Sequence, residues 1–153
     1  MKIPISKTIL SENEISSVIK TIKSGWLVQG PKVKEFERLF SKFVGVKYSI
    51  AVTSCTTALN LSLAALNIGK GDEVIVPAFT WISTANVVEN LNAKVVFCDI
   101  DLNTFNIDVS KIESKISKKT KAIIPVHLFG LAADIKKISS IAKKNKIKII
   151  EDA

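Results

Sequence analysis

Short apolar runs alternate with helical patterns over two-thirds of this chain, and this alternation limits the folds open to it. The apolar runs have the length of strands. They lie at residues 48–52, 73–77, 94–100, 121–128 and 147–152. The helical patterns that separate them lie at residues 56–66, 82–91, 110–116 and 134–145. Strands that alternate with helices predict an α/β fold, with a mostly parallel sheet and helices on both of its faces.

Two further helices are predicted before the first strand. Ser11 and Glu14 form an S-x-x-E capping box, which marks a helix start, and Gly25 ends that helix. Pro31 suits the first turn of a second helix, which Gly45 closes. The loop GWLVQGP connects the two helices.

Charge and hydropathy narrow the classes of function. The net charge is +8, but Arg38 is the only arginine and the lysines are spread along the chain, which argues against base readout of a nucleic acid. No apolar run approaches the roughly 20 residues of a membrane span, and the N-terminus lacks the pattern of a signal peptide. Cys55 and Cys98 are far apart and match no metal spacing, so we expect two free thiols, no metal site and a cytoplasmic location.

Ligands of parallel sheets bind beyond the carboxyl ends of the strands, so the residues that follow each strand are the first candidates. The segment after residues 48–52 places Ser54, Thr56 and Thr57 at a helix start. Hydroxyls and free N–H groups there bind an anion such as a phosphate, although Ser54 also suits plain N-capping. Trp81, beyond the second strand, either stacks on a flat ligand ring or packs in a core or an interface.

The later strand ends are less specific. Asp99, Asp101 and Asn103 resemble the start of a calcium loop, but Thr104 stands where that loop needs glycine, so we interpret them as turn formers and caps. His127 follows the fourth strand and suits a structural role more than a catalytic one.

The last strand ends in Glu151 and Asp152, where a carboxylate is costly unless a partner compensates it. A cationic cofactor nitrogen would do so, and N-capping of a following helix is the alternative. Together, these positions describe one ligand with a phosphate, a flat ring and a basic ring nitrogen. Pyridoxal 5'-phosphate (PLP) has all three.

Five ordered motifs then carry a family resemblance. They are SGWLVQGPKVKEFE, VTSCTTALNLSLAAL, GDEVIVPAFTWISTANVV, TKAIIPVHLFG and IIEDA. With them the chain resembles the N-terminal portion of the DegT/DnrJ/EryC1/StrS family of sugar-nucleotide aminotransferases, PLP enzymes with the type I aspartate-aminotransferase fold. The resemblance implies an N-terminal helix and entrance loop at residues 1–30 and a partial PLP-binding large domain at residues 31–153.

The resemblance also implies roles for single residues. Cys55 and Thr56 would hold the cofactor phosphate, with Ser54 beside them. Cys55 departs from the glycine or alanine usual in the family, which narrows the pocket. Trp81 would stack on the pyridine ring, and Asp152 would pair with its protonated nitrogen.

For two further parts of the site, the resemblance implies a location but no specific contact. Gly25, Trp26, Leu27 and Gly30 would lie at the entrance that the sugar nucleotide uses. His127 would lie near the pocket wall as an auxiliary residue.

The implied reaction passes an amino group from an amino acid, glutamate by preference, to a keto group of a nucleotide-linked sugar. Biosynthesis of surface polysaccharides or other glycans is the implied context, and a homodimer the implied assembly. The family's Schiff-base lysine is expected beyond Ala153, so this chain alone is expected to be inactive. The alternative is a non-catalytic product that binds PLP or a partner chain.

Overall fold

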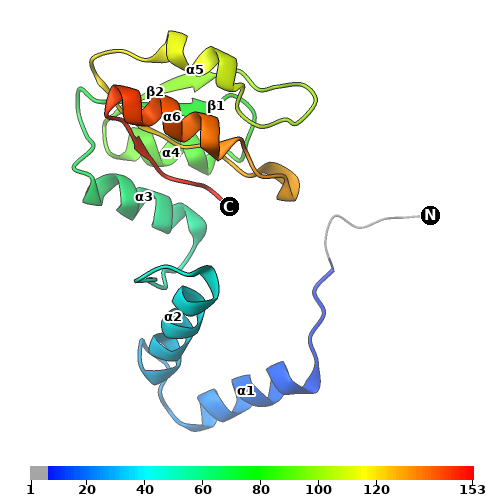
Figure 1. Cartoon of the computed structure of the whole chain (residues 1–153). Helices are drawn as coiled ribbons and strands as arrows, with labels where there is room; N and C mark the ends of the chain where they lie inside the picture. Colours follow the sequence, from blue (N-terminus) through cyan, green and yellow to red (C-terminus); the bar gives the residue numbers. More distant parts are fainter. Residues whose placement is uncertain (1–6) are drawn as a thin grey trace. The chain divides into compact units, whose positions relative to one another are not determined.

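The computed structural model describes residues 7–153 (Figure 1). They divide into two compact units, one ending at Ala51 and the other spanning Val52–Ala153, and each is described by itself. Within the described residues, no helix is long and apolar enough to cross a membrane.

The N-terminal unit contains two amphipathic helices, α1 (Glu12–Lys23) and α2 (Pro31–Val44). The predicted capping box begins α1: the Ser11 side chain accepts a hydrogen bond from a backbone N–H of the first turn, and the Glu14 side chain accepts one from the Ser11 N–H. Gly45 ends α2 in the left-handed conformation at φ 78°, which favours glycine. Neither helix buries a single residue.

The second unit contains a four-stranded sheet with four helices. The strands are β1 (Glu73–Pro77), β2 (Lys94–Cys98), β3 (Thr120–Ile123) and β4 (Lys148–Ile149). The helices are α3 (Cys55–Ala65), α4 (Ser83–Asn90), α5 (Val109–Lys115) and α6 (Ile135–Asn145), and a short 3₁₀ turn spans Leu128–Gly130. All strand pairs are parallel, in the order β2-β1-β3-β4, which confirms the predicted fold class.

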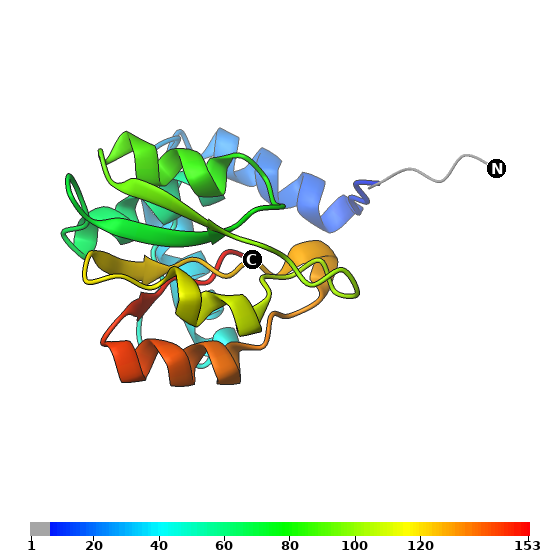
Figure 2. The ribbon, with the colours of Figure 1, turned by 90° about the horizontal axis from the view of Figure 1, so that it is seen from above.

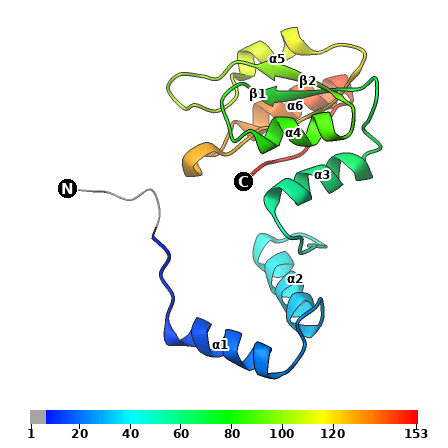
Figure 3. The same ribbon diagram turned by 180° about the vertical axis from the view of Figure 1, so that it is seen from behind.

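Two apolar clusters cover the two faces of the sheet. Leu63 of α3 and Val87 of α4 pack with Val74 and Val76 of β1 on one face. On the other face, residues of α5 and α6 pack with Ile75 and Ile123. Figure 2 shows α4 on one side of the strands and α5 and α6 on the other, and Figure 3 shows α3 on the α4 side. β1 is buried along its whole length because it is central, with helices over both faces.

One predicted strand is absent. Residues 48–52 form no strand pairing, and Ile50 is 80% exposed although it lies in a short apolar run. Glu37 of α2 holds this segment instead: its carboxylate accepts from the Ala51 N–H at 2.9 Å, and its carbonyl accepts from Ser49 Oγ at 2.5 Å. One backbone donor of the segment, the Ala51 N–H, is therefore bonded to a helix rather than to a strand.

The fourth and fifth predicted strands are real but shorter than predicted. β3 ends at Ile123, and beyond it only a parallel bridge between Val126 and Asp152 continues the pairing with the last strand. Pro125 lies in between and has no N–H to donate to a ladder. This bridge fixes the backbone of Asp152 beside the end of β3.

Candidate active site

The candidate site lies where the strand order reverses. The chain passes from β1 outward to β2, then returns to the opposite side of β1 for β3 and β4. Open parallel sheets bind ligands at such a switch point, outside the carboxyl ends of the strands. The segments that leave these ends carry Thr84 after β1 and Asp152 after β4, and α3 begins with Cys55.

Asp152 forms hydrogen bonds through its backbone and through both oxygens of its carboxylate. Its N–H donates to the Pro125 carbonyl at 3.0 Å, and its carbonyl accepts from the His127 N–H at 2.9 Å. The Thr84 hydroxyl donates to Asp152 Oδ2 at 2.8 Å, and the Cys55 thiol donates to Oδ1 at 3.2 Å. Three segments far apart in sequence therefore meet at one carboxylate.

The start of α3 carries free donors. Ser54 is the N-cap in an extended conformation, and its Oγ accepts from the Thr57 N–H at 3.1 Å. The capping role that the sequence left open is therefore the one Ser54 has. The N–H groups of Cys55 and Thr56 precede the first intrahelical donor, so the helix itself gives them no acceptor. They are available to an anion, and binding of the cofactor phosphate by Cys55 and Thr56 stays a prediction.

The two thiols are free and differ in environment. Cys55 is exposed, yet partial desolvation, followed by the hydrogen bond to Asp152, raises the pKa of its thiol. Cys98 is buried at the end of β2, and its burial raises the pKa of its thiol to about 11. Both side chains are therefore protonated at neutral pH, and the Cys55 thiol acts as a donor toward the Asp152 carboxylate.

Trp81 lies in the turn that leads into α4. Its side chain is 78% exposed, and its carbonyl accepts from the Thr84 N–H at 3.1 Å. Trp81 is therefore not a core residue, and its packing in an interface is left as an interpretation of the sequence. Stacking on a ligand ring stays a prediction.

His127 forms hydrogen bonds that hold neighbouring loop segments together. Its Nδ1 accepts from the Ala133 N–H at 3.1 Å, so the neutral ring carries its proton on Nε2, which lies 3.0 Å from Glu151 Oε2. These bonds tie the segment after β3 to the segment after β4. A role for His127 at the pocket wall stays a prediction.

The predicted entrance loop belongs to the N-terminal unit. The Trp26 indole donates from Nε1 to the Gln29 carbonyl at 3.1 Å and lies against Gly30. Gly25 has φ 74°, and Leu27 is 71% exposed. The role of Gly25, Trp26, Leu27 and Gly30 in admitting a sugar nucleotide stays a prediction.

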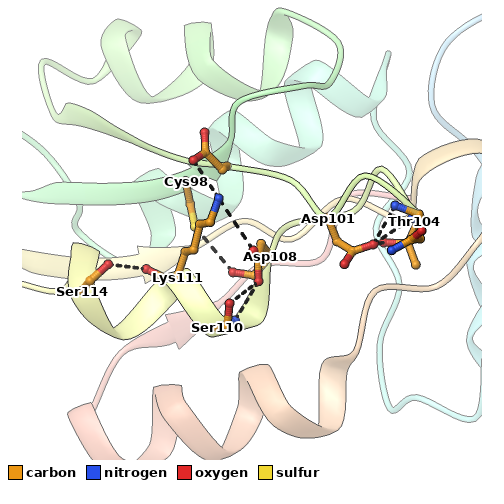
Figure 4. A network of polar contacts seen from close by, with 9 residues as sticks. Cys98, Asp101, Thr104, Asp108, Ser110, Lys111 and Ser114 are labelled. Atoms are coloured by element: carbon orange, nitrogen blue, oxygen red, sulfur yellow. Dashed lines mark hydrogen bonds and ion pairs between the residues drawn. The ribbon is translucent and has the colours of Figure 1, made fainter.

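The acidic segment after β2 forms a turn, as interpreted from the sequence. Asp101 Oδ1 accepts from the N–H groups of Asn103 and Thr104 at 2.9 and 3.0 Å (Figure 4). Lys111 pairs with Asp99 at 3.0 Å, and Asp108 caps α5. Within residues 7–153, no cluster of three or more acidic, histidine or cysteine side chains has the arrangement of a metal site.

A cavity of about 800 Å³ opens beside this turn rather than at the switch point. Asp101, Asp108, Asp134 and Lys137 are among its lining residues. Their charged groups are already engaged, since Asp134 caps α6 and pairs with Lys137 at 2.9 Å. We therefore assign the candidate site to the switch point.

Sequence reasoning missed Thr84. It lies three residues after Trp81 in the first turn of α4 and is fully buried, which is unusual for a hydroxyl without a function or a partner. Its position directly beyond the carboxyl end of a central strand was the available signal. The sequence alone indicates a ligand contact for Trp81, the larger side chain of the same segment, and not for Thr84.

The residues present fit a phosphate-bearing, cationic-ring ligand. The free N–H groups at the start of α3 suit an anion, and Asp152 suits a protonated ring nitrogen. In the part of the chain that the structure describes, no lysine, arginine or histidine forms an ion pair with Asp152. Fold and site together are those of an α/β protein with a parallel sheet, whose switch point has the groups that suit a phosphate-bearing heterocyclic ligand.

The model of the DegT/DnrJ/EryC1/StrS aminotransferase family matches residues 8–153, and the chain belongs to this family. It is 46% identical over 151 residues to the spore coat polysaccharide biosynthesis protein SpsC of Bacillus subtilis, an alignment that covers 99% of this chain and 39% of SpsC. An uncharacterized protein of Methanocaldococcus jannaschii, MJ1066, shows the same identity and coverage.

Solved structures of sugar aminotransferases resemble the chain as well. The putative sugar aminotransferase Spr1654 of Streptococcus pneumoniae, in its PMP form, superimposes with a TM-score of 0.95 at 36% identity, over 100% of this chain and 42% of that one. Its PLP form gives 0.93. The chain thus spans about two-fifths of the length of these relatives. The family and the two cofactor forms indicate PLP as the cofactor.

Proposed function

We propose that the chain binds PLP at the switch point, as part of an enzyme that moves an amino group from an amino acid to a nucleotide-linked keto sugar. The observation that carries this proposal is the Asp152 carboxylate, whose two oxygens are held by Thr84 and by Cys55 at the start of α3. A carboxylate fixed beside an open helix N-terminus suits a ligand with an anion at one end and a cationic nitrogen at the other.

Each part of the site has a distinct physical role. The N–H groups of Cys55 and Thr56, with the dipole of α3, would bind the phosphate. Asp152 would favour the charged form of the ring nitrogen, and the exposed Trp81 indole would lie on the ring face. When bound, the cofactor supplies an electron sink for the carbanion chemistry of amino transfer.

The substrate class rests on the family and on one relative. SpsC is named for spore coat polysaccharide biosynthesis, which suits a sugar acceptor in a surface polysaccharide pathway. Glutamate is the donor we propose. We further propose that these 153 residues bind the cofactor without completing amino transfer. The family resemblance expects the Schiff-base lysine in a Ser/Phe-rich segment before several glycines, and the nearest match, Lys42 in FSKFVG, precedes a single glycine and lies on α2.

Binding of pyridoxamine 5'-phosphate (PMP) tests the cofactor proposal. Asp152→Asn removes the negative charge that faces the ring nitrogen and should weaken PMP binding about tenfold or more, measured by titration calorimetry. Asp99→Asn is the matched control, because Asp99 pairs with Lys111 instead and should leave the affinity unchanged. Equal affinities for the native chain and Asp152→Asn would contradict the proposed site.

A second measurement distinguishes a chain that catalyses amino transfer from a chain that only binds the cofactor. PLP-loaded chain is mixed with glutamate, and the absorbance of the bound cofactor is followed over one turnover. We expect retained binding with no conversion. Conversion at the rate of a working aminotransferase would show that the chain needs no further lysine.

We also propose a cytoplasmic homodimer. Both cysteines are free, which suits a reducing compartment, and the apolar faces of α1 and α2 are exposed in the described unit. Chemical cross-linking of the purified chain, followed by mass determination, would detect the dimer.

A further inference from the structure

The Asp152 carboxylate receives two donors that come from different helices. Thr84 Oγ1 in α4 donates to Oδ2 at 2.8 Å, and Cys55 Sγ at the start of α3 donates to Oδ1 at 3.2 Å. A carboxylate has about four acceptor positions, so two donors leave room for a third partner. The bonds restrict rotation of the carboxylate without occupying it fully.

Thr84 is placed for this role by burial. Its residue exposure is 0%, while the Cys55 and Trp81 side chains near the same strand ends are exposed. Near the start of a helix, a threonine hydroxyl commonly bonds to local backbone. Here the hydroxyl bonds to a carboxylate 68 residues later in the chain, and no buried side-chain polar atom of the described residues is left without a partner.

Cys55 adds a donor that glycine or alanine at this position would lack. Its thiol is protonated at neutral pH, for the reasons of desolvation and contact with Asp152 given above. The thiol therefore reports on the carboxylate: any change that moves Asp152 away changes the thiol's own ionisation.

We propose that Thr84 and Cys55 are positioning residues that clamp the two oxygens of Asp152 and so aim this carboxylate at its cofactor. The identity of the ligand that Asp152 binds rests on the proposed function. The clamp itself, meaning the hydrogen bonds from Thr84 and Cys55 to Asp152, is present in the chain without cofactor. Thr84 sets the carboxylate plane from the buried side, and Cys55 holds the other oxygen from the solvent side.

The reactivity of the Cys55 thiol toward 5,5'-dithiobis(2-nitrobenzoic acid) tests the clamp without cofactor. The initial rate is measured against pH on the full chain. Asp152→Asn removes the charge and should lower the midpoint pH of the Cys55 reaction. Thr84→Val frees the carboxylate to turn away and should shift the midpoint in the same direction by a smaller amount, whereas Thr84→Ser keeps the hydroxyl and should restore the native midpoint.

Cys98 is the internal control for folding, because it is buried and should stay unreactive in every folded variant. A midpoint that is unchanged or raised in Thr84→Val, with Cys98 still protected, would overturn the role of Thr84. If Thr84→Val exposes Cys98, this variant is misfolded and Asp152→Asn provides the test instead. An unchanged midpoint pH of the Cys55 reaction in Asp152→Asn would overturn the contact between Cys55 and Asp152, on which the clamp depends.

PMP binding separates this inference from the proposed function. Thr84→Val should weaken PMP binding severalfold, Thr84→Ser should bind like the native chain, and Cys55→Ala should fall between them. A native chain that shows the thiol shifts but does not bind PMP would refute the proposed function and leave the clamp standing. Native PMP binding without any thiol shift would refute the clamp and leave the function standing.

Discussion

At the scale of single residues, close packing around glycine shapes the loop between α1 and α2. Gly30 lies directly under the Trp26 indole: a Cβ built on Gly30 would stand 1.9 Å from Trp26 Nε1. The φ of Gly30 is −171°, so its backbone accepts any residue, and the constraint comes from the indole alone. The same indole is bonded to the Gln29 carbonyl, which fixes its orientation over the start of α2.

Gly30→Ala should therefore displace the indole. We expect loss of the Trp26–Gln29 hydrogen bond and a destabilisation of about 1 kcal/mol, because alanine is also a poor N-cap. The measurement is the fluorescence emission maximum of Trp26 in a Trp81→Phe background, together with chemical unfolding. Gly69→Ala is the control, since its Cβ would meet its nearest neighbour, the Leu91 carbonyl, at an ordinary 3.6 Å. An unchanged emission spectrum in Gly30→Ala would contradict the packing.

At the scale of secondary-structure elements, Glu73 joins three segments at the amino ends of the strands. It is the first residue of β1, and its carboxylate accepts from Lys94 of β2 at 3.1 Å and from Ser117, ahead of β3, at 2.5 Å. The hydrogen bond from Ser117, and then that from Lys94, lower the pKa of Glu73. A lowered pKa in the folded state stabilises the fold at pH values above the usual glutamate pKa of about 4.3.

Acid should remove this contribution. As pH falls below about 4.3 and through the lowered pKa of Glu73, the stabilisation disappears. Glu73→Gln should lower the thermal midpoint by roughly 3–6 °C at pH 7 and by much less near pH 3. Glu113→Gln is the matched control, because Glu113 forms an exposed pair with Lys144 and should have little effect. Equal effects of Glu73→Gln at pH 7 and pH 3 would exclude the linkage.

The sequence predicted those elements whose signals are local. The capping box at Ser11, the glycine stop at Gly45 and the buried run Glu73–Pro77 all reappear at the predicted places. The predicted strand at residues 48–52 was wrong: its apolar run is typical of a strand, but the Ala51 N–H and the Ser49 hydroxyl bond to Glu37 on a helix. These contacts depend on a residue 12 and 14 positions earlier in the chain, which an apolar run does not indicate.

The candidate site was predictable only in part, for the same reason. Asp152 follows from the rule that ligands lie beyond strand ends. The start of α3 was predicted by the same rule from a strand at residues 48–52, which the structure does not form. The contacts of Asp152 with Thr84 and Cys55 span 68 and 97 residues, so no spacing rule reaches them. Ser54 shows the opposite case: its capping bond is local, and the sequence already contained that interpretation.

At the scale of the whole molecule, the two units differ in how they are stabilised. The sheet unit has two apolar clusters, one on each face. The N-terminal unit has helices with no buried residue, and its large apolar side chains lie in solvent. These include Ile15, Val18, Ile19 and Ile22 on α1 and Phe36, Leu39, Phe40 and Phe43 on α2. Two helix faces of this kind carry more exposed apolar surface than a stable monomer normally tolerates.

The purified chain should therefore self-associate through these helix faces. We expect a mass above 16.7 kDa by size-exclusion chromatography with light scattering, increasing with concentration. The ring centroids of Phe36 and Phe40 lie 5.7 Å apart on α2. The double substitution Phe36→Glu with Phe40→Glu therefore places two charges on that face and should shift the distribution toward monomer. Leu102→Glu is the matched control, because Leu102 is 80% exposed but lies outside both helices. A monomeric native chain, or equal association of the α2 variant and the Leu102 variant, would show that α2 does not carry the contact.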